Sequence, residues 1–252
     1  AASVSGPSAA ATTTVVSDDF SRTVNTGFGS APVGGTYLHD QTSGLRVDGN
    51  QAAMALSASV ARSVLIGPAD VRDVDGTVSF AVSALPTAGS VYLSQKLRTA
   101  SSGAYLSPRL RIMPDKRIYL GLRYVDASGT ATSIGTDVTL GFQAAANTRI
   151  SLRSQIEGST MRAKAWLKGS AEPTDWQASA VTTQLPNPGR FGVWGYLGGS
   201  TNSISILIDD VSVISLAPTP TPTPTPAPTL TPTPAPTPTP APTPTPTPAP
   251  TP

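Results

Sequence analysis

The chain has 252 residues, no cysteine, a single histidine and a formal net charge of +2 from 17 basic and 15 acidic side chains. Without cysteine there are no disulfides and no Cys/His clusters of the kind that bind zinc. No apolar run approaches the roughly 18 residues of a membrane-spanning helix, and the motifs of nucleic-acid-binding domains are missing. Outside its Pro-rich end the chain keeps about 217 residues, a length typical of one all-β domain.

Residues 1–14 are small and polar and lack hydrophobic periodicity, so we expect a leader or assembly arm there. This composition also suits a chain that begins after a removed signal peptide. We expect residues 15–217 to form the folded domain. Strands are predicted, in chain order, from Val15 and at Leu45–Val47, Gln51–Leu56, Ser59–Gly67, Gly76–Ser83, Val91–Arg98, Tyr105–Met113, Arg117–Val125, Thr136–Thr139, Thr148–Ile156, Met161–Lys168, Arg190–Leu197 and Ser203–Leu216.

Most of these segments alternate apolar and polar residues, the two-residue period of a strand that is buried on one side. In the last strand the apolar set changes phase across Asp209 and Asp210, which predicts a β-bulge. About twelve short strands with Gly-rich connections are typical of a sandwich or a barrel. An Asp pair in both the first and the last strand suggests that these strands are neighbours, as a sandwich allows. We therefore expect an all-β fold of two antiparallel sheets.

Residues 91–168 carry much of the positive charge. They hold 12 basic and 4 acidic residues, against 5 basic and 11 acidic residues elsewhere. If the five strands predicted there share one sheet, its outer face consists of Tyr, Trp, Arg and Lys, and the acids fall in the connections. The alternative is a solvated face whose arginine stems cover apolar surface.

Such a face has the chemistry of a glycan-binding surface, because aromatic rings stack on sugar rings and guanidinium groups hydrogen-bond polar or anionic substituents. Trp194 and Tyr196 share a face of another strand and extend the surface if that strand is adjacent. The candidate glycan-binding residues are Tyr92, Tyr105, Arg109, Tyr119, Arg123, Arg153, Lys164 and Trp166.

Residues suited to catalysis are few. His39 lies in a turn-rich segment, no GxSxG elbow is present, and the two glutamates, Glu157 and Glu172, fall in a turn and a loop. A glycosidase needs two carboxylates that face each other across the scissile bond. We therefore expect a protein that is not an enzyme.

Calcium is the one cofactor for which ligands are at hand, because it prefers oxygen ligands. Asp18, Asp19, Asp209 and Asp210 form a candidate calcium site if the first and last strands pair. The alternative is that these aspartates cap turns and interrupt the strands.

The segments DDFSRTVNTGFGSAPVGGTYL (18–38) and ILIDDVSV (206–213) resemble secreted jelly-roll domains of the concanavalin A-like, laminin-G-like type. Domains of this type are appended to extracellular polysaccharide-degrading enzymes and surface proteins. The resemblance implies two antiparallel sheets, a concave face that takes a glycan and, in some members, a structural calcium near the termini. The closely spaced acidic motif of laminarinase-like enzymes with this fold is absent.

Residues 218–252 are Thr-Pro and Ala-Pro repeats interrupted by one leucine. Proline fixes φ and favours polyproline II, so we expect an extended linker. Dense Thr-Pro repeats also predict O-linked glycans. Together these features predict a secreted or cell-surface protein.

Two functions are compatible with these observations. The first is a non-catalytic extracellular carbohydrate-binding module with a polysaccharide as its partner. The second is a structural subunit of a filament or surface layer, in which the leader pairs with a neighbouring copy and oppositely charged faces meet. In the second case acids such as Asp70, Asp73 and Asp75 would cover the basic face of the next copy.

Overall fold

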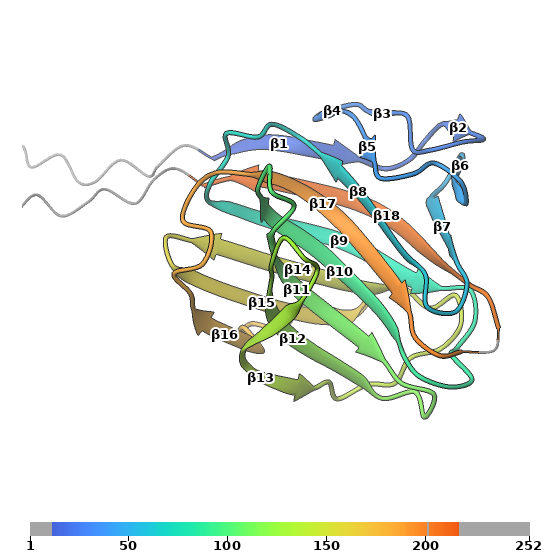
Figure 1. The fold of residues 1–252 in the computed structure, drawn as a ribbon. Helices are drawn as coiled ribbons and strands as arrows, with labels where there is room; N and C mark the ends of the chain where they lie inside the picture. The colour runs from blue at the N-terminus through green and yellow to red at the C-terminus, as the bar shows by residue number, and fades with distance from the viewer. Residues whose placement is uncertain (1–11, 201, 217–252) are drawn as a thin grey trace, which may run out of the picture. The chain divides into compact units, whose positions relative to one another are not determined.

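The computed structural model describes residues 12–200 and 202–216 (Figure 1). Within these ranges there is no helix, and eighteen β-strands form two large antiparallel sheets and one small one. The expected all-β, two-sheet architecture is confirmed. The expected linker lies outside the described residues. So does most of the expected leader, but Thr13 and Thr14 already belong to the first strand.

Sheet I has the strand order β16-β15-β14-β9-β18-β7-β6-β2, and β1 also pairs with β18. Its strands are β1 (Thr13–Asp18), β2 (Thr23–Val24), β6 (Leu45–Asp48), β7 (Ala52–Leu56), β9 (Val74–Val82), β14 (Ile150–Glu157), β15 (Thr160–Leu167), β16 (Ala178–Val181) and β18 (Ile204–Ser215).

Sheet II has the order β13-β12-β11-β10-β17-β8-β5. Its strands are β5 (Leu38–His39), β8 (Ala61–Ile66), β10 (Val91–Thr99), β11 (Tyr105–Ile112), β12 (Ile118–Val125), β13 (Ala131–Thr139) and β17 (Arg190–Leu197). A small hairpin consists of β3 (Ser30–Ala31) and β4 (Gly35–Thr36).

The core lies between sheets I and II. Alternate residues of each strand, such as Leu93 and Leu97 of β10 and Phe80 of β9, are fully buried in it. Each such side chain contributes about 1.5–3 kcal/mol through the water-accessible area that it loses. Gln95 and Ser154 are polar residues in this core: the Ser154 hydroxyl donates to Gln95 Oε1, and Gln95 Nε2 donates to the carbonyls of Gly76 and Leu152 of the opposite sheet at 3.2 and 2.8 Å. The two-residue period therefore fixes which side chains remain on the outer faces.

The last strand, β18, pairs with different strands in its two halves. Residues Ile204–Ile208 of β18 pair with β7, and Val211–Ser215 pair with β1. Between these halves the register with β9 shifts, and Asp210 has a left-handed φ of 48°. The predicted bulge and the predicted pairing of first and last strands are confirmed. The edge of β1 also bonds within the chain, because Ser17 exchanges two backbone hydrogen bonds with Val33.

The five central strands do not share a sheet, so this part of the sequence interpretation is wrong. Strands β10, β11 and β12 lie in sheet II, whereas β14 and β15 lie in sheet I. The chain leaves sheet II through β13, which is longer than the predicted Thr136–Thr139 and forms the edge of that sheet. The alternation of polar and apolar residues shows which side of a strand faces solvent. It does not show to which sheet the strand belongs. The expected single basic face is therefore two separate faces.

Candidate functional site: a groove on the outer face of sheet II

A groove of about 590 Å³ lies on the outer face of sheet II. Strands β8, β10, β11 and β17 form its floor and walls, and the turn between β12 and β13 forms one rim. It is lined by Ala61, Ser63, Tyr92, Lys96, Tyr105, Arg109, Gly129, Ala131, Trp194 and Tyr196. Aromatic rings and cations from three different strands, β10, β11 and β17, thus meet in one depression.

Three half-buried aromatic rings form one side of the groove. Strands β10 and β17 are neighbours in a register that places Tyr92 opposite Tyr196 and Ser94 opposite Trp194. The rings of Trp194 and Tyr196 stack with centroids 6.0 Å apart, and that of Tyr92 lies 5.9 Å from Tyr196. The small residue Ser94 is the cross-strand neighbour of both Trp194 and Arg109, so these two large side chains come together over it.

Arg109 lies among these rings. Its guanidinium carbon is 4.6 Å from the centroid of Trp194 and 6.0 Å from that of Tyr92, within the range of cation–π attraction. Its Nε has no hydrogen-bond partner, and burial lowers the pKa of its guanidinium. No carboxylate among the described residues forms an ion pair with it. Arg109 is therefore a desolvated cation held by aromatic faces.

Lys96 is the second cation of the groove and only 7% exposed. Its Nζ lies 4.2 Å from the centroid of the Tyr105 ring and donates to Ser63 Oγ at 3.1 Å. Burial lowers the pKa of Lys96 to about 8, and the nearby charge of Asp40 opposes that shift. Within the described part of the chain, Lys96 also lacks an ion pair. An ammonium group in this position retains donors for a further acceptor.

The structure divides the eight predicted glycan-binding residues. Tyr92, Tyr105 and Arg109 line the groove. Tyr119 and Arg123 lie beside it on β12. The Arg123 guanidinium is paired with both carboxylate oxygens of Asp137 at 2.5 and 2.7 Å. Tyr119 is covered by the guanidinium groups of Arg111 and Arg117, 4.5 and 5.9 Å from its ring centroid.

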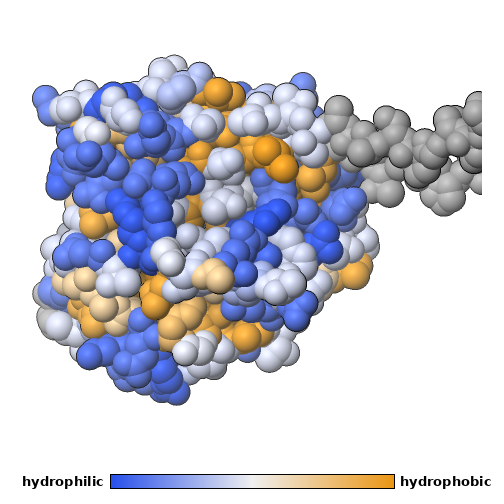
Figure 2. All heavy atoms as spheres, turned by 180° about the vertical axis from the view of Figure 1, so that it is seen from behind, coloured by the Kyte–Doolittle hydropathy of each residue, from blue (hydrophilic) through white to orange (hydrophobic). Residues whose placement is uncertain are grey.

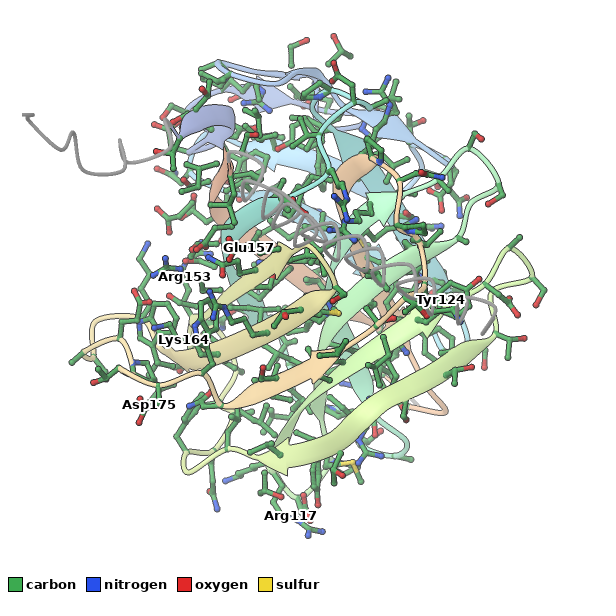
Figure 3. All side chains as sticks on the ribbon, turned by 90° about the vertical axis from the view of Figure 1, so that its left-hand side faces the viewer. Arg117, Tyr124, Arg153, Glu157, Lys164 and Asp175 are labelled. Carbon is green, nitrogen blue, oxygen red and sulfur yellow. The ribbon has the colours of Figure 1, made fainter. Side chains whose placement is uncertain are left out.

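The other three, Arg153, Lys164 and Trp166, belong to β14 and β15 of sheet I. Figure 3 shows Arg153 and Lys164 together along the yellow strands, with Arg117 apart from them at the bottom of the view. Figure 2 shows one face of the molecule on which polar residues cover most of the surface and apolar residues appear between them.

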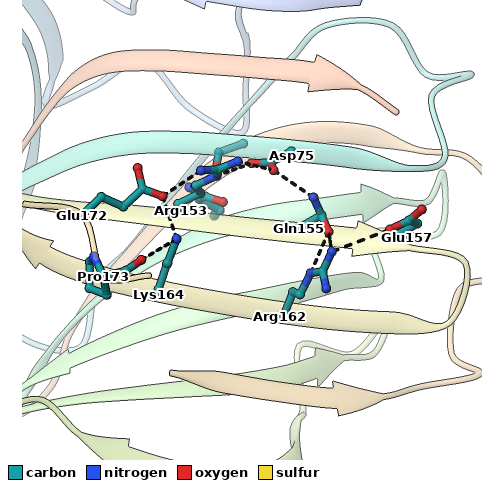
Figure 4. A network of polar contacts seen from close by, with 10 residues as sticks. Asp75, Arg153, Gln155, Glu157, Arg162, Lys164, Glu172 and Pro173 are labelled. Carbon is teal, nitrogen blue, oxygen red and sulfur yellow. Dashed lines mark hydrogen bonds and ion pairs between the residues drawn. The ribbon is translucent and has the colours of Figure 1, made fainter. Parts of the chain in front are cut away.

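A closed network covers the outer face of sheet I (Figure 4). Arg153 binds both carboxylate oxygens of Asp75 at 2.8 Å and one of Glu172 at 2.7 Å. Lys164 contacts the same Glu172 at 2.8 Å and donates to the carbonyl of Pro173 at 2.6 Å. Both cations lie over the Trp176 ring, 5.6 and 5.0 Å from its centroid. The expectation of an arginine face without acids is therefore wrong here, because β9 and the segment after β15 supply them.

Two of the three acids that we considered as contacts to a second copy, Asp73 and Asp75, have partners in their own chain. Asp73 and Asp75 are each 6% exposed. Asp73 Oδ1 accepts from Arg98 Nη2 at 2.5 Å and from the amide of Gly158 at 3.0 Å. Both carboxylates therefore stabilise the fold of a single chain.

The predicted calcium ligands do not converge. Asp18 is bound by both terminal nitrogens of Arg22 at 2.7 and 2.8 Å and by the Tyr37 hydroxyl. Asp19 accepts from the amide of Ser21, which caps the turn. Asp209 lies 3.4 Å from Arg149, and Asp210 pairs with Lys168. Over residues 12–200 and 202–216 no three His, Cys, Asp or Glu side chains are grouped as a metal site. The alternative expectation, aspartates that cap turns, fits these contacts.

The polar and aromatic groove residues outside the set predicted from the sequence are Lys96, Ser63, Trp194 and Tyr196. The shared face of Trp194 and Tyr196 was a usable signal, but their adjacency to Tyr92 depends on β17 lying beside β10.

His39 lies outside the groove lining; its Nε2 accepts from the amide of Phe28 at 3.0 Å, and burial lowers its pKa. Nothing in the described part of the chain forms a helix with the length and apolar character of a transmembrane span.

Neither a family model nor a curated protein matches the chain. Solved structures do match. LamA from Z. galactanivorans, in complex with laminaritriose and laminaritetraose, superposes with a TM-score of 0.55 at 10% identity over 81% of this chain and 99% of its own. The CBM2 module of the evolved Dit of Lactobacillus casei BL23 phage J-1 gives 0.52 at 10% identity over 83% and 98%. The Ca²⁺- and Man3GlcNAc-bound exoplasmic/lumenal domain of VIP36 gives 0.50 at 14% over 74% and 85%. These likenesses establish the concanavalin A-like jelly-roll fold.

Proposed function

We propose that this protein is a non-catalytic carbohydrate-binding module that holds a polysaccharide in the groove of sheet II. The observation that carries the proposal is the arrangement of Tyr92, Trp194 and Tyr196 around the unpaired cations Lys96 and Arg109. The rings offer flat apolar faces to a sugar ring, and the cations and Ser63 offer hydrogen bonds to its substituents. The fold is shared with a glycan-bound VIP36 domain and a carbohydrate-binding module.

Binding is favoured over hydrolysis by the chemistry of the lining. Glycoside hydrolysis requires a pair of carboxyl groups flanking the bond. Among the described residues that line the groove, none is Asp or Glu. Glu172, which could serve elsewhere, is engaged with Arg153 and Lys164 on the other sheet. The likeness to LamA therefore concerns the fold alone, since no pair of acids lines this groove.

The proposal includes an extracellular or cell-surface location, with the Thr-Pro segment as a glycosylated linker. It is supported by the composition of residues 218–252 and by the likeness to the exoplasmic/lumenal domain of VIP36. The filament alternative has less support. Thr13 and Thr14 pair with β18 of the same chain, and Asp73 and Asp75 are internally bound.

Affinity electrophoresis against a panel of neutral and acidic polysaccharides tests the function. We expect at least one polysaccharide to retard the protein. The Trp194→Ala variant should lose about 2 kcal/mol of binding free energy, roughly 30-fold in affinity, as for an aromatic hot spot. Trp176→Ala, in the segment between β15 and β16 whose ring lies against Arg153 and Lys164 of sheet I, is the matched control and should bind as the wild type does. No retardation by any member of the panel would remove the proposal.

A further inference from the structure

Cations on the outer surfaces of this domain differ in whether an acid lies against them. Arg123 and Arg153, both partly buried, bind the carboxylates of Asp137 and Asp75. Lys96, which is 7% exposed, and Arg109, which is half-buried, both line the groove and have no ion pair within the described residues. A buried charge is costly unless it is paired. The groove thus concentrates two such charges where a ligand is expected.

The two cations are placed to act on one ligand group. Ser94 of β10 is opposite Arg109 of β11, and Lys96 follows Ser94 by two residues on the same face. Diagonal neighbours of this kind lie about 7–8 Å apart and are within reach of long side chains. Their free donors can therefore converge on an acceptor from both sides, next to the Trp194 ring on which Arg109 lies.

We infer that the groove selects an acidic glycan, with a carboxylate or sulfate group held between Lys96 and Arg109. The inference rests on the function proposed above and specifies the class of its ligand. A neutral hydroxyl accepts a hydrogen bond but leaves both charges unneutralised, whereas an anion forms charge-assisted hydrogen bonds that are about twice as strong. Burial lowers the pKa of the Lys96 ammonium to about 8 despite the opposing charge of Asp40, which agrees with a cation that has no ion-pair partner among the described residues.

Matched pairs of polymers test the inference. Polygalacturonate and its carboxyl-reduced form differ only in the carboxylate, and dextran sulfate and dextran differ only in the sulfate. Dissociation constants are measured by titration calorimetry with the full chain. We expect the acidic member of at least one pair to bind roughly 10–100-fold more tightly than its neutral counterpart, and the responding pair tells carboxylate from sulfate.

Three variants distinguish a built site from general attraction. Lys96→Met and Arg109→Gln should each remove most of the preference for the acidic member. Arg46→Gln removes the same charge from an exposed position on β6 of sheet I and should retain that preference. Two groove variants are used so that the loss of fold in one, checked by thermal unfolding, does not decide the result.

Each outcome has a definite reading. Acidic members that bind no more tightly than their neutral counterparts overturn the inference and leave the proposed function standing if any glycan binds. A preference that falls equally in Lys96→Met and Arg46→Gln is long-range attraction and also overturns it. If no polysaccharide of the wider panel binds, the proposed function fails as well.

Discussion

The two sheets carry the same chemical motif on their outer faces and use it in opposite ways. On sheet II, Arg109 lies 4.6 Å from the centroid of Trp194. On sheet I, Arg153 and Lys164 lie 5.6 and 5.0 Å from that of Trp176. Arg153 and Lys164 are neutralised by Asp75 and Glu172. Arg109 has no carboxylate partner among the described residues, and no acid lines its groove.

Cation and aromatic residues on alternating strands are therefore not sufficient to make a binding surface. The deciding factor is whether the fold delivers an acid to that face. Asp75 reaches sheet I because β9 pairs with β14 in a register that places it opposite Gln155, next to Arg153. The resulting network is internally satisfied and contributes to the fold. The groove of sheet II keeps cations without an acid partner, and these lower the stability of the fold. We expect a bound anion to offset that loss.

Removing an acid from sheet I should have the largest effect. Asp75→Leu leaves Arg153 and Gln155 without the carboxylate that they share. Arg153 is one-third exposed and keeps its contact with Glu172, so we expect a loss of about 2–3 kcal/mol in the free energy of unfolding in urea, below that of a fully buried pair. Asp175→Leu makes the same change at an exposed site and should stay within about 0.5 kcal/mol of the wild type. Equal losses in the two variants would show that the network contributes nothing.

Removing a cation from the groove should stabilise the fold, whereas removing an acid from sheet I should destabilise it. The pKa of Lys96 falls from 10.5 to about 8 on folding, so the folded state binds this proton more weakly than the unfolded state does. Holding the Lys96 ammonium charged therefore lowers the free energy of unfolding. This loss is complete below pH 8 and disappears as pH rises towards 10.5. We expect Lys96→Met to raise the free energy of unfolding by about 1–3 kcal/mol at pH 7 and by less at pH 10. A variant less stable than the wild type at pH 7 would contradict an unpaired, desolvated ammonium.

The pH dependence of binding should show the smallest effect. Lys96 faces Tyr105 of β11, Ser63 of β8 and the charge of Asp40. Burial raises the pKa of Tyr105, and an arginine stays protonated, so Lys96 is the group that titrates between pH 7 and 9. Affinity for an acidic glycan should fall by up to about tenfold over this interval, measured by calorimetry. Lys96→Met serves as the control and should show a flat profile; a flat profile for the wild type would exclude Lys96 from binding.

The sequence contained most of the information on strands and little on their partners. The two-residue period located β10, β11, β12 and β17, and the phase change at Asp209 and Asp210 located the bulge of β18. Period also separates the core side of a strand from its outer side. It does not state which strands are adjacent, because that depends on how the cores of distant segments pack. Tyr92 meets Tyr196, and Arg153 meets Asp75, only through the sheet order.

The central claim is that glycan binds to sheet II and not to sheet I, and the three tryptophans allow a direct measurement. The double variant Trp166→Phe/Trp176→Phe keeps Trp194 as its single tryptophan, and Trp194→Phe keeps the two of sheet I. Both are titrated with a polysaccharide that retards the wild type, and tryptophan emission is recorded. We predict a saturable change from Trp194 and none from Trp166 and Trp176. A saturable change confined to the sheet I tryptophans would contradict the assignment.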